Sequence, residues 1–227
     1  MRRLILFDID GTLVRGGPAK VAFETAMVET YGTAGDVAGL SFAGKTDPQI
    51  ARELLTGAGL DRRTIDDGLP ELWERYLRYL EAGLPQTPMR VLAGVRELLD
   101  ALVAVEGVAL GLVTGNIADG ARLKLGSAGL WQRFAVGGYG SDHEERDRLP
   151  AVALERARAH WSAELEPCDA VIVGDTPRDV ACGRACGNRT LAVATGTFTA
   201  EALRATGADH VLEDLSATDR VLELLTA

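Results

Sequence analysis

The sequence predicts an α/β protein whose core is a Rossmann-like parallel sheet covered by helices on both faces. Short apolar runs such as 4–7, 108–113 and 170–173 are nearly continuous, which is typical of strands buried on both sides. From about Gly94 onward, helical patterns alternate with these runs, as in successive βαβ units. With 227 residues, 47% of them hydrophobic, the chain can also bury a substantial core.

The expected elements of this core follow one another in regular alternation. Each strand ends before a helix that returns the chain to the other end of the sheet. In order they are strand 4–7, helix 94–105, strand 108–113, helix 118–128, a weaker strand at 134–136, helix 149–162, strand 170–173, helix 177–186, strand 190–194 and a short strand at 210–212.

A helical insertion interrupts the core after its first strand. Helices are expected over 19–31, from Pro48 with Asp47 as N-cap, and over 69–81. Glycine and proline punctuate both ends of the insertion, which suits hinges. We therefore expect a discontinuous α/β core, residues 1–14 and 88–227, and a helical cap domain, residues 15–87.

Composition excludes several classes of partner. The formal charge of −9 and the lack of a basic cluster argue against nucleic acid and anionic membranes. No run approaches the ~18 apolar residues of a membrane span. Three sparse cysteines favour a reducing compartment, so a soluble cytoplasmic protein is expected. The oligomeric state is left open.

Two carboxylates, Asp8 and Asp10, follow the first strand directly. Side chains two apart on a strand point to the same face, so these acids are expected to converge where the strand stops. Paired carboxylates there are costly to hold ionised unless a metal or a catalytic role stabilises them. This is the first indication of an active site.

Polar groups follow two further strands. Thr114-Gly115-Asn116 comes after strand 108–113, and Gly174-Asp175-Thr176-Pro177-Arg178-Asp179 comes after strand 170–173. Ligands of open α/β sheets bind beyond the carboxyl ends of strands, where helix N-termini attract anions. The Thr114 hydroxyl suits a phosphoryl oxygen. Asp175, together with Asp8 and Asp179, can supply oxygens to Mg²⁺.

A basic side chain should complete such a site by neutralising the transferring group. Arg146 and Arg148 both precede helix 149–162, and their positions leave the choice open. Lys45, one of only three lysines, lies in a glycine-bounded loop of the insertion. We expect it to contact an anionic or hydroxylated substrate.

These segments resemble the four motifs of the haloacid dehalogenase superfamily, in order and approximate spacing. The motifs are Asp8-Ile9-Asp10-Gly11-Thr12-Leu13, Thr114-Gly115-Asn116, an arginine near 146, and Gly174-Asp175-Thr176-Pro177-Arg178-Asp179. The insertion resembles that superfamily's C1-type cap. The chain is therefore similar to C1-capped phosphatases of the phosphoglycolate phosphatase-like type, with Arg146 where those enzymes usually carry lysine.

The resemblance implies a role for each residue. Asp8 would be the nucleophile and form an aspartyl-phosphate, while Asp10 would act as general acid and base. Thr114 would hold phosphoryl oxygens, with Gly115 and Asn116 beside the substrate. The metal ligands would be Asp8, the backbone carbonyl of Asp10, Asp175 and Asp179. The expected activity is Mg²⁺-dependent hydrolysis of a small phosphorylated metabolite.

Three alternatives are weighed against this prediction. A phosphoglucomutase-like phosphotransferase would keep all these residues. A phosphonoacetaldehyde hydrolase-like enzyme would depart from Asp10, although a cap lysine near Lys45 would suit it. Residues 39–46 also match the P-loop pattern GxxxxGK[ST], but no apolar strand precedes them, so a P-loop nucleotide-binding protein is a remote alternative.

Overall fold

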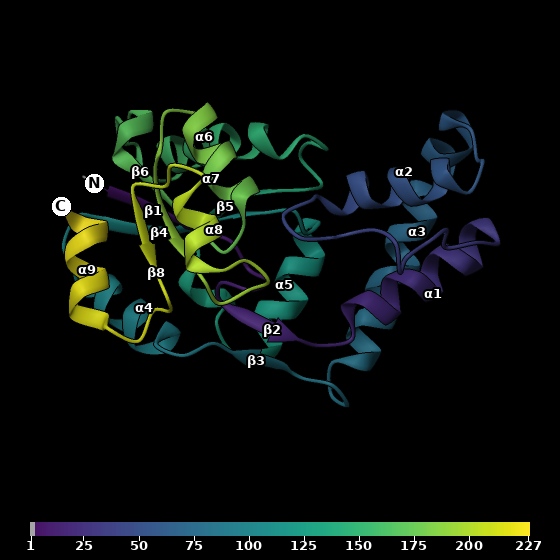
Figure 1. The fold of residues 1–227 in the computed structure, drawn as a ribbon, viewed down its shortest axis with the longest axis horizontal. Helices are drawn as coiled ribbons and strands as arrows, with labels where there is room; N and C mark the ends of the chain where they lie inside the picture. Colours follow the sequence, from purple (N-terminus) through teal and green to yellow (C-terminus); the bar gives the residue numbers. More distant parts are fainter. Residues whose placement is uncertain (1–2) are drawn as a thin grey trace.

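A six-stranded parallel sheet forms the centre of the protein. The computed structural model describes residues 3–227 and orders the strands β5-β4-β1-β6-β7-β8 (Figure 1). The strands are β1 (Arg3–Phe7), β4 (Val108–Thr114), β5 (Val136–Tyr139), β6 (Ala170–Gly174), β7 (Arg189–Val193) and β8 (His210–Leu212). The predicted α/β fold class is confirmed.

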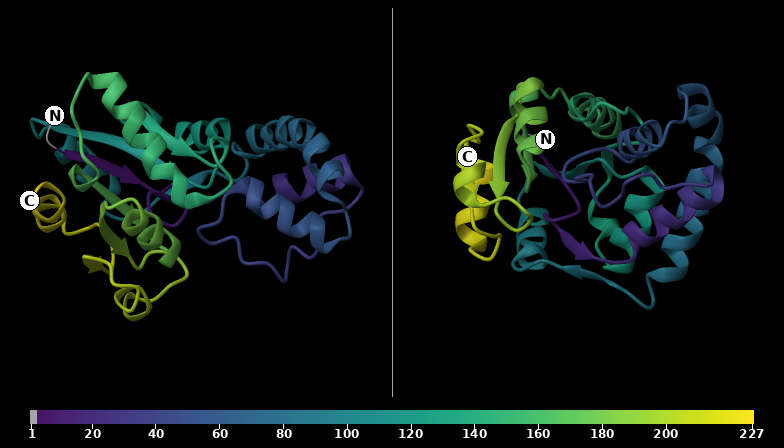
Figure 2. Two further views of the ribbon diagram at one scale, coloured as in Figure 1. Left: turned by 90° about the horizontal axis from the view of Figure 1, so that it is seen from above. Right: turned by 45° about the vertical axis from the view of Figure 1, so that its right-hand side comes forward.

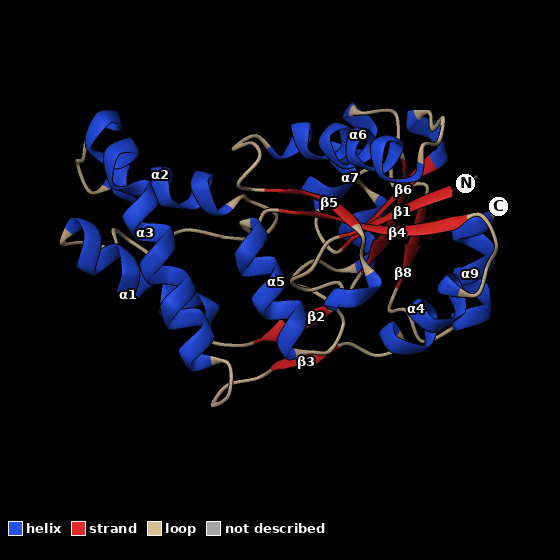
Figure 3. Ribbon diagram, turned by 180° about the vertical axis from the view of Figure 1, so that it is seen from behind, coloured by secondary structure: helices blue, strands red, loops and turns tan. Residues whose placement is uncertain are grey.

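Helices cover both faces of this sheet because alternate strand residues point to opposite sides. Leu4 and Leu6 of β1 pack in one cluster with α6, whereas Ile5 and Phe7 pack in another with α4 and α9. In Figure 3, α6 and α7 lie above the strands and α4 and α9 below. The core helices are α4 (Val95–Val103), α5 (Ala118–Ser127), α6 (Leu149–Trp161), α7 (Pro177–Ala185), α8 (Ala200–Arg204) and α9 (Thr218–Thr226).

A second group of helices, here called the cap helices, stands beyond one end of the sheet (Figure 2). It consists of α1 (Ala19–Tyr31), α2 (Asp47–Gly57) and α3 (Arg62–Gly83). Phe23 of α1 packs edge-on against Tyr76 of α3 at 5.3 Å between ring centroids. The helices lie within the expected insertion, while the boundary residues of a separate cap domain stay a prediction.

Two sequence expectations for this region were wrong in detail. Helix α3 begins at Arg62 instead of residue 69, because the Asp61 carboxylate caps it by accepting a hydrogen bond from the Thr64 N–H at 3.1 Å. The helix also continues through Pro70. Thr46, not Asp47, is the N-cap of α2 and accepts from the Gln49 N–H.

A short antiparallel ribbon joins the cap helices to the sheet. Its strands are β2 (Val14–Gly16), at the start of the insertion, and β3 (Met89–Val91), just after its end, and neither was expected from the sequence. Three-residue strands next to glycine or proline carry too little periodicity to be recognised. Strand β5 likewise begins two residues later than expected, because Trp131–Arg133 form a 3₁₀ turn. Within residues 3–227, no helix combines the length and apolar character that crossing a membrane requires.

Candidate active site

Three neighbouring strands bring the predicted residues together. Strands β4, β1 and β6 are adjacent and parallel, so their carboxyl ends share one edge. Asp8 follows β1, Thr114 ends β4 and Asp175 follows β6. Ligands of such sheets bind at this edge. The sheet order therefore converts three distant sequence segments into one site.

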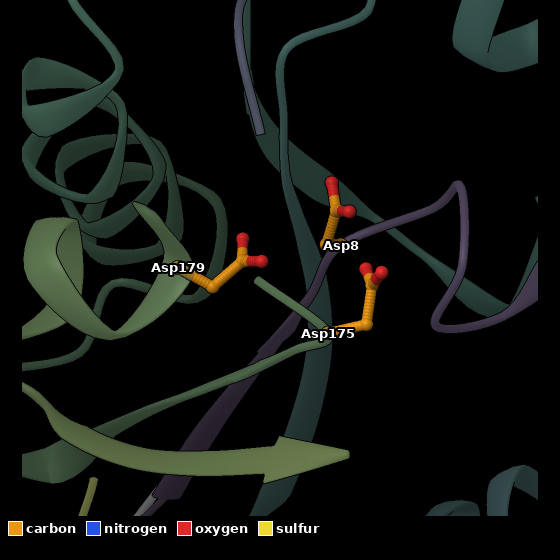
Figure 4. A group of neighbouring side chains, drawn as sticks. All are labelled: Asp8, Asp175 and Asp179. Carbon is orange, nitrogen blue, oxygen red and sulfur yellow. The ribbon is translucent and has the colours of Figure 1, made fainter. Parts of the chain in front are cut away.

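Three buried carboxylates form what we call the acidic cluster: Asp8, Asp175 and Asp179. Each offers an oxygen within 4.8 Å of the others, and Figure 4 shows the three side chains converging. Asp179, in the first turn of α7, accepts hydrogen bonds from the Thr176 N–H at 2.9 Å and hydroxyl at 2.7 Å. Asp175 accepts from the Thr12 hydroxyl at 3.2 Å. These bonds fix the orientation of both acids.

Arg146 is the cation of this cluster. Its Nη2 lies 2.9 Å from Oδ1 of Asp8 and also pairs with Asp179, and the side chain is buried. Arg148, two residues on, is exposed and pairs with Glu145. The 3₁₀ turn that the two arginines share therefore directs Arg146 inward and Arg148 toward solvent.

The charges of the acidic cluster are not balanced by the protein. Burial raises the pKa of Asp8 to about 7, against the lowering effect of Arg146. Burial, followed by the nearby charge of Asp8, raises the pKa of Asp175 to about 8. In addition, Oδ1 of Asp8 is buried without a well-aligned hydrogen bond in the described chain. A divalent cation with oxygen ligands fits this deficit.

Asp10 occupies a different environment from Asp8, although both residues line the same cavity. Strand β1 ends at Phe7, and Asp10 lies in the following turn, so strand alternation no longer determines its direction. Its Oδ2 accepts from Nζ of Lys124 at 2.7 Å and from Nδ2 of Asn116 at 2.8 Å. We call these three residues the Asp10 group.

Lys124 is a site residue that the sequence reasoning missed. It is 5% exposed and lies on the buried face of α5 with Ala121 and Leu125. In the sequence, Lys124 lies three residues after Ala121 and one before Leu125, and this helical spacing was the available indication that it is buried. That signal alone does not reveal a partner, because Asp10 is more than a hundred residues away in the chain.

Thr114 and its two successors connect the core to the cap. The buried Thr114 hydroxyl accepts a hydrogen bond from Nδ2 of Asn116 at 2.8 Å. The Gly115 carbonyl accepts from the N–H of Asp47 at 2.8 Å. A Cβ on Gly115 would overlap the carbonyl group of Lys45, so glycine permits the close approach of the cap loop.

Residues 44–47, here called the cap loop, make further bonds to the core. Oδ2 of Asp47 accepts from the Ile117 N–H at the start of α5, at 2.9 Å. The Thr46 hydroxyl donates to the Glu144 carbonyl at 2.7 Å. Burial raises the pKa of Asp47 to about 6, although Lys124 acts in the opposite direction. The cap loop is therefore held against the same core segments that carry Asn116 and Arg146.

Between core and cap lies a cavity of about 480 Å³. All three lysines of the chain, Lys20, Lys45 and Lys124, line it, although the protein as a whole is acidic. Lys45 pairs there with Glu53 of α2. Buried Phe23 and Tyr76 supply an aromatic wall. Residues 33–46 contain no strand or helix, so the P-loop alternative lacks the strand that it requires.

Comparisons with known proteins agree with this geometry. A phosphoglycolate phosphatase of Xylella fastidiosa is 32% identical over 190 residues, covering 82% of this chain and 77% of its own. One from Pseudomonas putida is 28% identical over 225 residues, covering 95% and 78%. A crystal structure of a hydrolase from Pseudomonas syringae superposes with a TM-score of 0.72 at 20% identity, covering all of both chains.

The family model of haloacid dehalogenase-like hydrolases matches residues 5–193, which include every predicted core motif. The predicted family and the expectation of a hydrolytic enzyme are confirmed by this match and by the relatives. The chain belongs to the haloacid dehalogenase-like hydrolase family.

Proposed function

We propose that this protein is a Mg²⁺-dependent phosphatase that hydrolyses a small phosphorylated metabolite through an aspartyl-phosphate on Asp8. The observation that carries the proposal is the buried acidic cluster, with Arg146, beside a cavity between the core and the cap. The family match and the relatives named phosphoglycolate phosphatase support it.

Asp8 and Asp175, together with the backbone carbonyl of Asp10, would hold Mg²⁺. Asp179 is the weaker candidate ligand, because its oxygens already contact Arg146 and Thr176. When bound, the ion would offset the carboxylate repulsion and polarise the phosphoryl oxygens. The raised pKa values of Asp8 and Asp175 describe the cluster without this charge.

In the first step, a carboxylate oxygen of Asp8 attacks phosphorus, and the bond from phosphorus to the leaving oxygen breaks. Asp10 gives its proton to that oxygen, so the product leaves as a neutral alcohol. In the second step, water attacks phosphorus while Asp10 takes its proton. The bond between phosphorus and Asp8 then breaks, which restores the carboxylate and releases phosphate.

Arg146 and Thr114 would stabilise the phosphoryl group during both steps. Arg146 lies beside Asp8 and contributes a permanent positive charge where negative charge develops. Thr114 ends β4 at the same edge and offers a hydroxyl donor. Gly115 and Asn116 line the same cavity. The cap would exclude bulk water from the reaction.

The cavity lining favours a small substrate with negative charge beyond the phosphoryl group. Lys20 and Lys45 are the two lysines that the cap segment contributes to the cavity lining. A carboxylate or a second phosphate would meet them there. Phosphoglycolate has this chemistry and is the substrate named for several relatives, so it is the first compound to test.

The test is phosphate release from a panel of phosphorylated metabolites, with Mg²⁺ and with excess EDTA. The panel contains phosphorylated carboxylates, sugar phosphates and nucleoside monophosphates of similar size. We expect Mg²⁺-dependent turnover, highest for a phosphorylated carboxylate. Lack of turnover for the whole panel would contradict the phosphatase and favour the mutase-like alternative, which a sugar monophosphate with a bisphosphate activator would then test.

A further inference from the structure

Lys124 has no assigned role in the chemistry above, yet its position is costly. Its side chain is buried within α5, where an ammonium group loses most of its hydration. In the described chain, Asp10 is the one carboxylate within salt-bridge distance, at 2.7 Å. Asp10 itself is partly exposed, so the ion pair joins a buried ammonium group to a carboxylate that solvent can reach.

The contacts of Asp10 are unequal between its two oxygens. Lys124 and Asn116 both donate to Oδ2, whereas Oδ1 receives no hydrogen bond from residues 3–227. Asp10 also lines the cavity. One oxygen is therefore held by a cation and an amide, and the other is available to a ligand. Such an arrangement fixes the direction of the carboxyl group and leaves one oxygen to carry a proton.

The segments that carry Asp10 and its two partners explain why Asp10 needs a contact to orient it. Asp10 lies in the turn between β1 and β2, next to the ribbon that leads to the cap helices. That turn has no helix or long strand of its own to orient it. Lys124 and Asn116 belong to the β4–α5 segment, which is anchored in the core.

We infer that Lys124 is a positioning residue, which holds Asp10 so that its free oxygen meets the leaving oxygen of the substrate. The inference rests on the proposed function, because it assumes that Asp10 transfers the proton. A purely structural ion pair makes a different prediction: its loss would slow all substrates alike. Proton delivery matters most for a poor leaving group and least for a good one.

The experiment compares two substrates in rapid-mixing measurements with Lys124→Met, which keeps length and removes charge. The substrates are p-nitrophenyl phosphate, whose leaving group needs little protonation, and phosphoglycolate, whose alkoxide needs it. Product release in the first turnover reports the first step. Arg122→Met removes an exposed cation from the same helix and is the matched control. Lys124→Gln and Lys124→Arg complete the series.

We expect Lys124→Met to slow glycolate release in the first turnover by about 100-fold or more. The first-turnover release of nitrophenolate should fall by less than about tenfold, followed by slow turnover because water activation is also impaired. Lys124→Arg should recover part of the glycolate rate. Arg122→Met should match the wild type with both substrates.

Other results would separate the two proposals. If the wild-type protein hydrolyses neither compound nor any other phosphate of the panel, the proposed function fails. If the wild type hydrolyses both and Lys124→Met slows both first turnovers equally, or neither, the positioning role is overturned. Should Lys124→Met not fold, as judged by circular dichroism, the same comparison with Lys124→Gln decides.

Discussion

The acidic cluster and the Asp10 group lie side by side, yet they differ in the balance of their charges. The acidic cluster places three buried carboxylates around one arginine, so it lacks positive charge. The Asp10 group pairs one accessible carboxylate with a buried lysine and an amide, so its charge is already balanced. Two aspartates separated by one residue thus have different partners.

The difference shows how one turn of the chain can place two aspartates in environments that suit different chemical roles. A region that lacks positive charge suits a metal ion, and the bound ion would then attract the anionic phosphoryl group to the proposed nucleophile. A carboxylate that is accessible and held in one direction suits proton transfer. The separation arises just after β1 ends at Phe7: the Asp8 N–H still donates to the Val173 carbonyl of β6, whereas Asp10 lies in the following turn and contacts α5.

Replacement of the nucleophile should give the largest effect. Asp8→Asn keeps the shape of the side chain but cannot form the acyl phosphate, so we expect turnover below about 10⁻⁴ of the wild-type rate. The variant should fold normally, because it removes one of three mutually repelling acids. Phosphate release together with thermal unfolding checks both statements. Turnover above a few per cent of wild type would contradict the assignment of Asp8.

Removal of Mg²⁺ should abolish activity and reveal the charge deficit of the acidic cluster. The folded-state pKa values of Asp8 and Asp175 are raised to about 7 and about 8. Raised carboxyl pKa values stabilise the folded state below about pH 4, and that contribution is lost as pH rises through about 7 to 8. The free energy of unfolding of the metal-free protein should therefore fall by roughly a few kcal/mol between about pH 4 and about pH 8.

Denaturant unfolding with EDTA and with Mg²⁺ measures this effect. The stabilisation by Mg²⁺ should be larger at pH 8 than at pH 5, because the ionised carboxylates are the form that binds the metal. An equal stabilisation at both pH values would show that the metal does not bind at the acidic cluster.

The contact between cap loop and core can be broken at Gly115. A methyl group there would overlap Lys45, so Gly115→Ala should hold the cap away from the core. We expect kcat/KM to fall by roughly 10- to 100-fold, because displaced groups lose their alignment with the substrate. Gly126→Ala on α5, whose added methyl group meets open space, is the control and should remain near the wild type.

Substrate selection should depend on the cap more than on the core. Lys45→Met removes a cation from the cap side of the cavity, so it should raise KM for phosphoglycolate by about tenfold. KM for an alkyl phosphate that carries no charged group besides its phosphoryl group should change little, and kcat should change little for both substrates. If Lys45→Met leaves the relative rates across the panel unchanged, its Glu53 pair is merely structural.

The smallest effect should come from Asp47 of the cap loop. Its pKa is raised to about 6, mainly by burial, so its ionisation destabilises the folded protein as pH rises through about 6. Asp47→Asn cannot ionise but can still accept from the Ile117 N–H. We expect the variant to gain about 1 kcal/mol over the wild type between pH 4 and pH 7, after allowance for partial exposure.

Unfolding of both proteins at several pH values tests this expectation. The two proteins should differ least near pH 4, which serves as the internal control. A difference that is constant with pH would mean that Asp47 is hydrated when ionised and that the cap loop is open in solution.

Much of the core was determined by local sequence. The apolar runs and their spacing predicted the parallel sheet, and the acids and threonine after three of these runs predicted the site, because strand ends of one sheet meet at one edge. Functional residues at strand ends could be predicted because the strand fixes their position, as for Asp8, Thr114 and Asp175.

Only the tertiary structure decided what the turns and cap supply. The sequence favoured Arg146 without excluding Arg148, and one 3₁₀ turn buries the first and exposes the second. It predicted Asp10 near Asp8 but not its contact with the buried Lys124 of α5. It assigned Asp47 to a helix cap, whereas Asp47 binds the core. These contacts join residues that are distant in the chain. Local sequence patterns cannot predict them, because the packing of the helices against the sheet decides which loops come together.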